Sequence, residues 1–262
     1  MILSRSAKGA LAALTAAVLL FIYLPLLVVV INSFSTSRSF SWPPTALTTS
    51  WWQAAWNNAE VRSSLRLSLE IATTATLISL VLGTMAALAL QRYRFFGRDA
   101  VSLLIILPIA LPGIVTGLAF QHTFTTILNI KLGFATIVVA HATFCIVTVF
   151  NNVIARLRRV GGNLEEASMD LGAGTFTTFR LVTFPVLRSA LLAGGLLSFA
   201  LSFDEIIVTT FTASGGTRTL PIWILDNMFR PNQAPVVNVV AATLIVLSVV
   251  PIWLAQRLSQ DD

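Results

Sequence analysis

The stretch Asn163-Leu-Glu-Glu-Ala-Ser-Met-Asp-Leu-Gly172 is a polar segment between two long apolar runs. Asparagine is a residue type that caps helices, and Glu165 and Glu166 follow Asn163 where the dipole of a first helical turn favours acidic side chains. Glycine favours the left-handed conformation in which many helices end. The pattern therefore predicts a helix of about two turns over residues 164–171, which is too short to be stable in water without a partner to pack against.

The residues after Gly172 predict a second short helix over residues 176–183. Pro185 is expected to end it, because proline lacks the backbone N–H donor and clashes with the preceding turn. A new apolar run begins directly afterwards. The segment 156–188 is thus expected to form two short helices that are joined at a glycine corner.

Apolar segments make up most of the chain on both sides of this loop. Of the 262 residues, 56% are hydrophobic and only 11% are charged, whereas soluble domains carry about a quarter charged residues. A helix that crosses a hydrocarbon core of about 30 Å needs about 20 predominantly apolar residues. Six segments meet this requirement, at residues 11–31, 67–90, 101–124, 135–153, 189–211 and 236–255. The sequence predicts an all-α, polytopic membrane protein with a single domain over residues 1–262.

The positive residues predict the orientation of these spans, since Lys and Arg are retained in short cytoplasmic loops. With the N-terminus inside, eleven of the 17 face the cytoplasm: Arg5, Lys8, Arg92, Arg94, Arg98, Arg156, Arg158, Arg159, Arg180, Arg188 and Arg257. The other six face outward: Arg38, Arg62, Arg66, Lys131, Arg218 and Arg230. Both termini and the loop 156–188 are therefore expected in the cytoplasm, and the chain is expected in the inner (plasma) membrane.

Several classes of activity lack their sequence signals. The only cysteine, Cys145, lies in an apolar run, so no intrachain disulfide and no cysteine-rich metal site is expected. The sequence contains no phosphate-binding loop of the Walker type, no metal-spaced His and Cys cluster and no nucleophile triad. The basic residues stand in short groups between apolar runs, which favours membrane orientation over nucleic-acid binding. The chain is interpreted as a conduit without a cofactor of its own, not as an enzyme.

Within the apolar runs, a few residues stand out. Pro108 and Pro112, followed by Gly113 and Gly117, predict a kink and a close helix approach in the third span, for either gating or structural bending. His141, a lone imidazole in the fourth span, is interpreted as a hydrogen-bond residue between helices and not as a ligand. The tryptophan-rich loop 33–64 predicts anchoring at the outer lipid surface, with contact to an external partner as the alternative.

The loop 156–188 resembles a known motif. Glu166-Ala167-Ser168, three residues, Gly172, nine residues and Val182-x-Phe184-Pro185 resemble the EAA loop of type I ABC importer permeases, whose pattern is Glu-Ala-Ala-x3-Gly-x9-Ile-x-Leu-Pro. Ser168, Val182 and Phe184 depart modestly from it. In that family the first helix of the loop seats in a groove of the ATPase. The resemblance implies a coupling role for the following residues: Glu165, Glu166, Ala167, Ser168, Asp170, Leu171, Gly172 and Pro185.

A second stretch resembles the spermidine/putrescine permease branch, in which a similar Ser-Phe-Asp-Asp/Glu sequence precedes Thr-Leu-Pro. Here it runs from Leu201-Ser-Phe-Asp-Glu205 to Thr219-Leu-Pro221. Asp204 and Glu205 are expected well inside the fifth span, where an ionised side chain needs water or a partner. One of them is predicted to meet a cationic amine; the alternative is pairing with a second permease. Glu70 and Asp226 are further candidates, for an outer ring that attracts cations.

The resemblance implies a set of partners: ABC ATPase subunits that bind ATP and Mg²⁺, a second permease in a heterodimer, and an external substrate-binding protein. Polyamine import is the leading hypothesis. Ferric iron, an opine or an amino-acid-like solute is the alternative cargo. A self-contained secondary transporter or channel is the hypothesis from another class.

Overall fold

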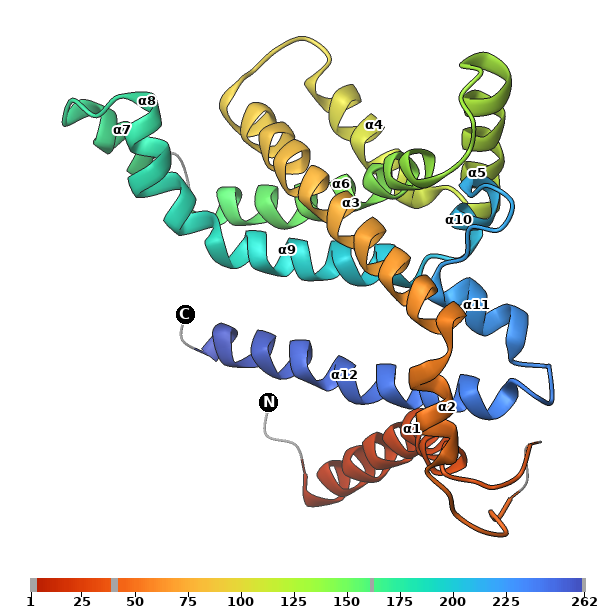
Figure 1. Cartoon of the computed structure of the whole chain (residues 1–262). Helices are drawn as coiled ribbons and strands as arrows, with labels where there is room; N and C mark the ends of the chain where they lie inside the picture. Colours follow the sequence, from red (N-terminus) through yellow and green to blue (C-terminus); the bar gives the residue numbers. More distant parts are fainter. Residues whose placement is uncertain (1–3, 39–41, 161–162, 261–262) are drawn as a thin grey trace. The chain divides into compact units, whose positions relative to one another are not determined.

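The structure is a computed structural model that describes residues 4–38, 42–160 and 163–260, with residues 249–260 described by their backbone. It is all-α, as predicted, and the only bridge between extended segments in the described part pairs Ser35 with Leu47. The elements in Figure 1 are α1 (Arg5–Asn32), α2 (Ser50–Asn57), α3 (Ala59–Arg92), α4 (Arg98–Ala110), α5 (Gly113–His122), η1 (Thr123–Ile127), α6 (Phe134–Val160), α7 (Asn163–Asp170), α8 (Thr175–Thr178), η2 (Phe179–Thr183), α9 (Phe184–Asp204), α10 (Ile207–Thr212), α11 (Leu220–Asn227) and α12 (Ala234–Gln260).

Among the described residues, four helices are long and apolar enough to cross a membrane: α1, α3, α6 and the continuous helix Thr175–Asp204, which joins α8, η2 and α9. A fifth is present if α4 is taken together with α5 and η1 as one bent span. In α12, the part with described side chains forms a shorter apolar helix, Ala234–Ser248. Four or five of the six predicted spans are therefore present as apolar helices. The sixth span stays a prediction.

The third predicted span, 101–124, is broken and not merely kinked. Helix α4 ends at Ala110 and α5 begins at Gly113, and the two parts meet at 104°. Proline disfavours the helical conformation in the residue before it, and Leu111 is extended, with φ −84° and ψ 141°. Pro112 therefore ends the helix, whereas Pro108 is accommodated inside α4.

The prediction of one continuous helix for the fifth span, 189–211, was wrong. Helix α9 ends at Asp204, Glu205 is extended with φ −73° and ψ 117°, and the short helix α10 follows. No glycine or proline marks this break in the sequence. It depends on polar side chains that are brought together by the fold, as described below.

The chain forms two compact units. The first contains residues 1–62 and 224–254 and the second contains residues 63–223 and 255–262. In the first unit, the apolar stretch of α1 is not buried. The tryptophan-rich segment is partly helical, because α2 lies within it, and Trp51 donates a hydrogen bond from Nε1 to the carbonyl of Ser35 at 3.0 Å.

In the second unit, α6 and α9 lie side by side (Figure 1), and α3 packs against α6. Their shared core consists of Ala87, Leu90, Val149, Phe150, Val153, Ile154 and Leu187. Gly83 permits the close approach of α3, since a Cβ atom there would lie 2.9 Å from both the carbonyl oxygen of Ile146 and the Cβ of Val149. This packing supports the loop that carries α7 and α8.

We expect Gly83→Ala to destabilise the second unit, because the added methyl group meets backbone and a β-branched side chain that cannot move aside. Overpacking of this kind costs about 1–3 kcal/mol. Gly195→Ala is the matched control, since its Cβ would lie at an ordinary 3.5 Å from the tip of Leu80. Thermal unfolding in detergent should show a lower midpoint for Gly83→Ala alone; equal midpoints would contradict the packing.

Candidate functional site

The short helix predicted over residues 164–171 is present as α7, Asn163–Asp170, within one residue of the expected bounds. Gly172 has φ +87°, its N–H bonds to the carbonyl of Met169 at 2.9 Å, and the N–H of Ala173 bonds to the carbonyl of Ser168 at 3.1 Å. These paired bonds around a left-handed glycine are a Schellman motif, which ends a helix. The predicted glycine corner is confirmed, while the residues before Asn163, 161–162, lie outside the described part of the chain.

The predicted stop at Pro185 was wrong. Residues 175–204 continue as one helical path through α8, the π-helical turn η2 and α9, with Pro185 in the first turn of α9. Proline cannot donate to the carbonyl four residues earlier, and a π-helical turn changes that pairing. The second short helix is therefore the cytoplasmic end of the longer helix.

Most residues of α7 and of the segment around it are exposed. Glu166, Ala167, Asp170 and Pro185 are exposed, and the side chain of Leu171 is 90% exposed. Ser168 is half-buried, and its hydroxyl lies 3.0 Å from that of Thr178 on α8. An exposed surface with both acidic and apolar side chains is available for a partner.

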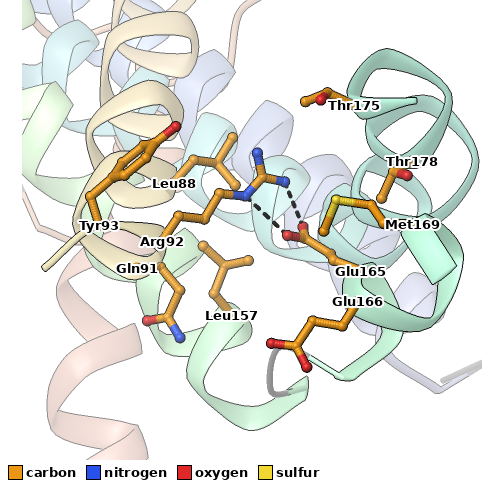
Figure 2. A pocket seen from close by; sticks show the side chains of 10 residues that line it. All are labelled: Leu88, Gln91, Arg92, Tyr93, Leu157, Glu165, Glu166, Met169, Thr175 and Thr178. Carbon is orange, nitrogen blue, oxygen red and sulfur yellow. Dashed lines mark hydrogen bonds and ion pairs between the residues drawn. The ribbon is translucent and has the colours of Figure 1, made fainter. Parts of the chain in front are cut away.

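Glu165 points the other way. Its carboxylate accepts two hydrogen bonds from the guanidinium of Arg92, from Nε at 2.9 Å and from Nη2 at 2.8 Å (Figure 2), and a third from the hydroxyl of Thr183 at 2.5 Å. Arg92 is the last residue of α3. Arg92 and Glu165 are among the residues that line a pocket of about 430 Å³. Figure 2 shows that the side chain of Glu166 is directed away from Arg92.

Partial burial raises the pKa of the Glu165 carboxyl, but the hydrogen bonds from Arg92 and Thr183 and the charge of Arg92 together hold that pKa below its ordinary value. The carboxylate is therefore ionised at neutral pH. The contribution of this ion pair to stability is fully present above the ordinary carboxyl pKa and is lost as the pH falls through the lowered one.

The two candidate pathway acids lie at the break between α9 and α10 and have different surroundings. Asp204, the last residue of α9, is exposed in this chain. Glu205 is half-buried, and its Oε1 accepts a hydrogen bond from the N–H of Val208 at 2.8 Å, in the first turn of α10. Glu205 thus satisfies a backbone donor at the start of a helix, which leaves Asp204 as the acid available to a ligand.

His141 holds this break in place from α6. It is fully buried, with Nδ1 at 2.8 Å from the hydroxyl of Ser202 and Nε2 at 2.9 Å from that of Thr209. The hydroxyl proton of Thr209 is donated to the carbonyl of Glu205 at 2.7 Å, so this hydroxyl accepts from His141. The hydrogen-bond pattern therefore assigns a proton to Nε2 of the imidazole. The interpretation of His141 as a residue that links helices is confirmed.

The two broken segments meet. Helices α5 and α10 lie together (Figure 1), and a Cβ atom on Gly117 would lie 2.6 Å from the ring of Phe211. The predicted close helix approach at Gly113 and Gly117 is thus present. Half-helices that end inside a membrane commonly surround the sites of transported solutes. The break beside Asp204 is accordingly the candidate pathway site.

The two outer acids are placed separately. Glu70 on α3 is exposed and forms an ion pair with Arg66 at 2.7 Å, one turn earlier on the same helix. Asp226 is exposed on α11, in the first unit. The outer ring of acids stays a prediction. Within the described part of the chain, no group of three or more His, Cys, Asp or Glu side chains is arranged to hold a metal ion.

The sequence interpretation missed the partners that position these acids. Arg92 was counted only as a topology signal, and it lies 73 residues before Glu165. Ser202 was noted only as part of a motif, and Thr209 was not singled out. A weak signal was available, since a basic residue at the end of one helix and an acidic residue at the start of another both complement the helix dipoles.

The chain is similar to proteins of known function. Residues 79–261 match the family model described as "Binding-protein-dependent transport system inner membrane component". The chain is 33% identical to the spermidine/putrescine transport system permease protein PotC of Escherichia coli K12, over 94% of this chain and 92% of PotC. It is 33% identical to the putrescine transport system permease protein PotI of the same strain, over 86% and 82%. A chain of a bacterial ABC transporter involved in the import of the acidic polysaccharide alginate has the same fold, with a TM-score of 0.72, 16% identity and coverage of 100% and 99%.

We expect His141→Leu to destabilise the protein, because two buried hydroxyl groups lose a partner at the break. Two hydrogen bonds inside a membrane protein correspond to about 1–3 kcal/mol. His122→Leu is the matched control, since His122 is exposed at the end of α5. Thermal unfolding in detergent should separate the two variants; a His141→Leu midpoint equal to that of His122→Leu would remove the structural role of the imidazole.

Proposed function

The chain belongs to the family of binding-protein-dependent transport system inner membrane components, and we propose that its cargo is a polyamine or a related small organic cation, which it conducts across the inner membrane. It is a non-catalytic permease subunit of an ABC transporter. This membership favours the ATP-driven importer over the self-contained secondary transporter or channel. The proposal therefore concerns the cargo, the partners and the residues that serve them.

The proposed arrangement has six spans in a single domain over residues 1–262, with both termini in the cytoplasm. The distribution of Lys and Arg and the four or five apolar helices support it. The proposed partners are ATPase subunits that bind ATP and Mg²⁺, a second permease subunit in a heterodimer, and an external substrate-binding protein. The family description, which refers to a binding protein, agrees with this set.

The exposed surface of α7 supports the proposed contact with the ATPase. A helix of two turns is not stable alone in water, yet α7 has no buried residue in this chain. Glu166, Ala167, Asp170 and Leu171 are all exposed there. We assign these side chains to the groove of the ATPase, with Gly172 setting the direction of the chain that follows.

Asp204 carries the cargo proposal. It is an exposed carboxylate at the end of a helix that stops within an apolar segment, next to the meeting point of α5 and α10. A carboxylate at such depth needs water or a compensating cation, and a protonated amine supplies that charge. The identity to PotC and PotI over most of the chain agrees with a polyamine cargo.

We predict that Asp204→Asn lowers the uptake of spermidine or putrescine, because it removes the charge that offsets a desolvated ammonium group. The KM for uptake should rise by at least about tenfold, the factor that corresponds to about 1.4 kcal/mol. The measurement is uptake of labelled amine by the reconstituted complex. Asp99→Asn, at an exposed position in the first turn of α4, is the matched control and should transport normally.

Two outcomes count against the pathway role. If Asp204→Asn and Glu205→Gln both import the amine at the wild-type rate, the acids are structural. If the complex dissociates in these variants, the acids belong to the contact with the second permease. Uptake of ferric iron, an opine or an amino acid by the wild-type complex, without amine uptake, would favour the alternative cargo.

We also predict that Gly172→Pro uncouples ATP hydrolysis from uptake while the protein still inserts. Proline fixes φ near −65°, whereas Gly172 has φ +87° and donates its N–H to Met169. Gly174→Ala is the control, because Gly174 has φ −71° and open space at its Cβ position. Uptake per ATP should fall by about tenfold or more in Gly172→Pro only. Normal transport by Gly172→Pro at normal membrane levels would overturn the coupling assignment.

A further inference from the structure

We propose that Arg92 and Glu165 form a clamp through which α7 moves the cytoplasmic end of α3, so that Glu165 is a positioning residue of the coupling step and not a contact for the ATPase. The inference rests on the proposed docking of α7 onto an ATPase. It goes beyond that docking, because it assigns opposite tasks to two adjacent glutamates and names the membrane helix that receives the motion.

The first observation is how little else holds α7 to the second unit. None of its residues is buried. Apart from the chain connections, the described side-chain hydrogen bonds of α7 run from Glu165 to Arg92 and Thr183, and from Ser168 to Thr178. Apolar packing is thus a small part of the attachment, and polar contacts of fixed direction are the larger part.

The second observation is the geometry of the clamp. A guanidinium that bonds both carboxylate oxygens through Nε and Nη2 restricts distance and orientation together, which a single hydrogen bond does not. The side chains are 32% exposed for Arg92 and 20% exposed for Glu165, so water screens the pair less than a fully exposed pair. The hydroxyl of the buried Thr183 binds Glu165 from the opposite element, η2. The carboxylate therefore connects α3, α7 and η2.

The third observation is that both charges suit their helices. Arg92 is in the last turn of α3 and Glu165 is in the first turn of α7. A cation at a helix C-terminus and an anion at a helix N-terminus each complement the local dipole. The clamp thus joins the negative end of α3 to the positive end of α7 through side chains of the opposite sign.

The consequence is mechanical. Beyond the glycine corner at Gly172, the chain is one continuous helix from Thr175 to Asp204, so a push on α7 reaches α9 through that corner and the helix backbone. Without the clamp, the motion of α7 would reach α3 only through the packing of apolar side chains within the membrane. With the clamp, α3 and α9 move as a rigid body when α7 is displaced. Neutralising either partner should leave docking intact and weaken this transfer.

The test uses the reconstituted transporter with Arg92→Gln, Glu165→Gln and the double reversal Arg92→Glu/Glu165→Arg. Arg94→Gln is the matched control, because Arg94 is an exposed arginine two residues beyond α3. Membrane level and unfolding midpoint are measured for each variant, together with ATPase co-purification and amine uptake per ATP hydrolysed. The single variants should retain the ATPase but lose uptake per ATP by at least about fivefold, within the usual range of coupling energies. The double reversal should recover a substantial part of that loss, and the control should lose nothing.

A distance measurement separates a relay from a merely structural contact. Spin labels are attached at Tyr93→Cys and Thr177→Cys, which are both exposed positions. In the otherwise wild-type complex, the distance between the two labels should be the same before and after nucleotide binds. In Arg92→Gln that distance should change with nucleotide.

Three outcomes would overturn the inference. Wild-type uptake per ATP in both single variants would show that the clamp transfers nothing. Loss of the ATPase from Glu165→Gln would make Glu165 a docking residue, which still supports the proposed function. No gain in the double reversal would show that the pair does not act together. By contrast, if the wild-type chain itself retains no ATPase, the proposed function fails before the clamp is tested.

Discussion

Hydrocarbon supplies no hydrogen-bond partner to an interrupted helix, and the arrangement of the second unit follows from this constraint. The chain stops being helical between α9 and α10, where the N–H of Val208 and the carbonyl of Glu205 need partners. The Glu205 carboxylate and the Thr209 hydroxyl provide them. His141 then fixes Thr209 from α6. Glu205, Thr209 and His141 together thereby allow a break in an apolar segment, beside which Asp204 is exposed.

The same need for partners explains the cytoplasmic loop. Helix α7 cannot be stable as an isolated element of eight residues, so it requires contacts on both sides. On the inner side, Glu165 binds Arg92 and Thr183. On the opposite face of α7, acidic and apolar side chains are exposed. We propose that the ATPase binds this face. Neighbouring residues on a helix point about 100° apart, and this angle separates the tasks of Glu165 and Glu166.

The comparisons show how much sequence difference is compatible with this fold. At 16% identity the alginate transporter chain still has the same fold over its whole length. The 33% identity to PotC extends over 94% of this chain, and the 33% identity to PotI extends over 86% of it. Packing of apolar helices tolerates many substitutions of similar volume. The polar groups at helix breaks tolerate fewer, since each satisfies a particular backbone atom.

The sequence by itself determined the helical class, the apolar segments, the helix α7 and the glycine corner at Gly172, because these depend on composition, on local capping and on a backbone conformation that glycine favours. It also identified the region of the proline break, although not its angle. Only the tertiary structure decided that the fifth segment is broken after Asp204, that Pro185 lies within a continuous helix, and that Glu165 faces Arg92 while Glu166 does not. These features depend on partners up to 73 residues apart in the chain, and a pairing across that distance exists only once α3, α6 and α9 have packed together.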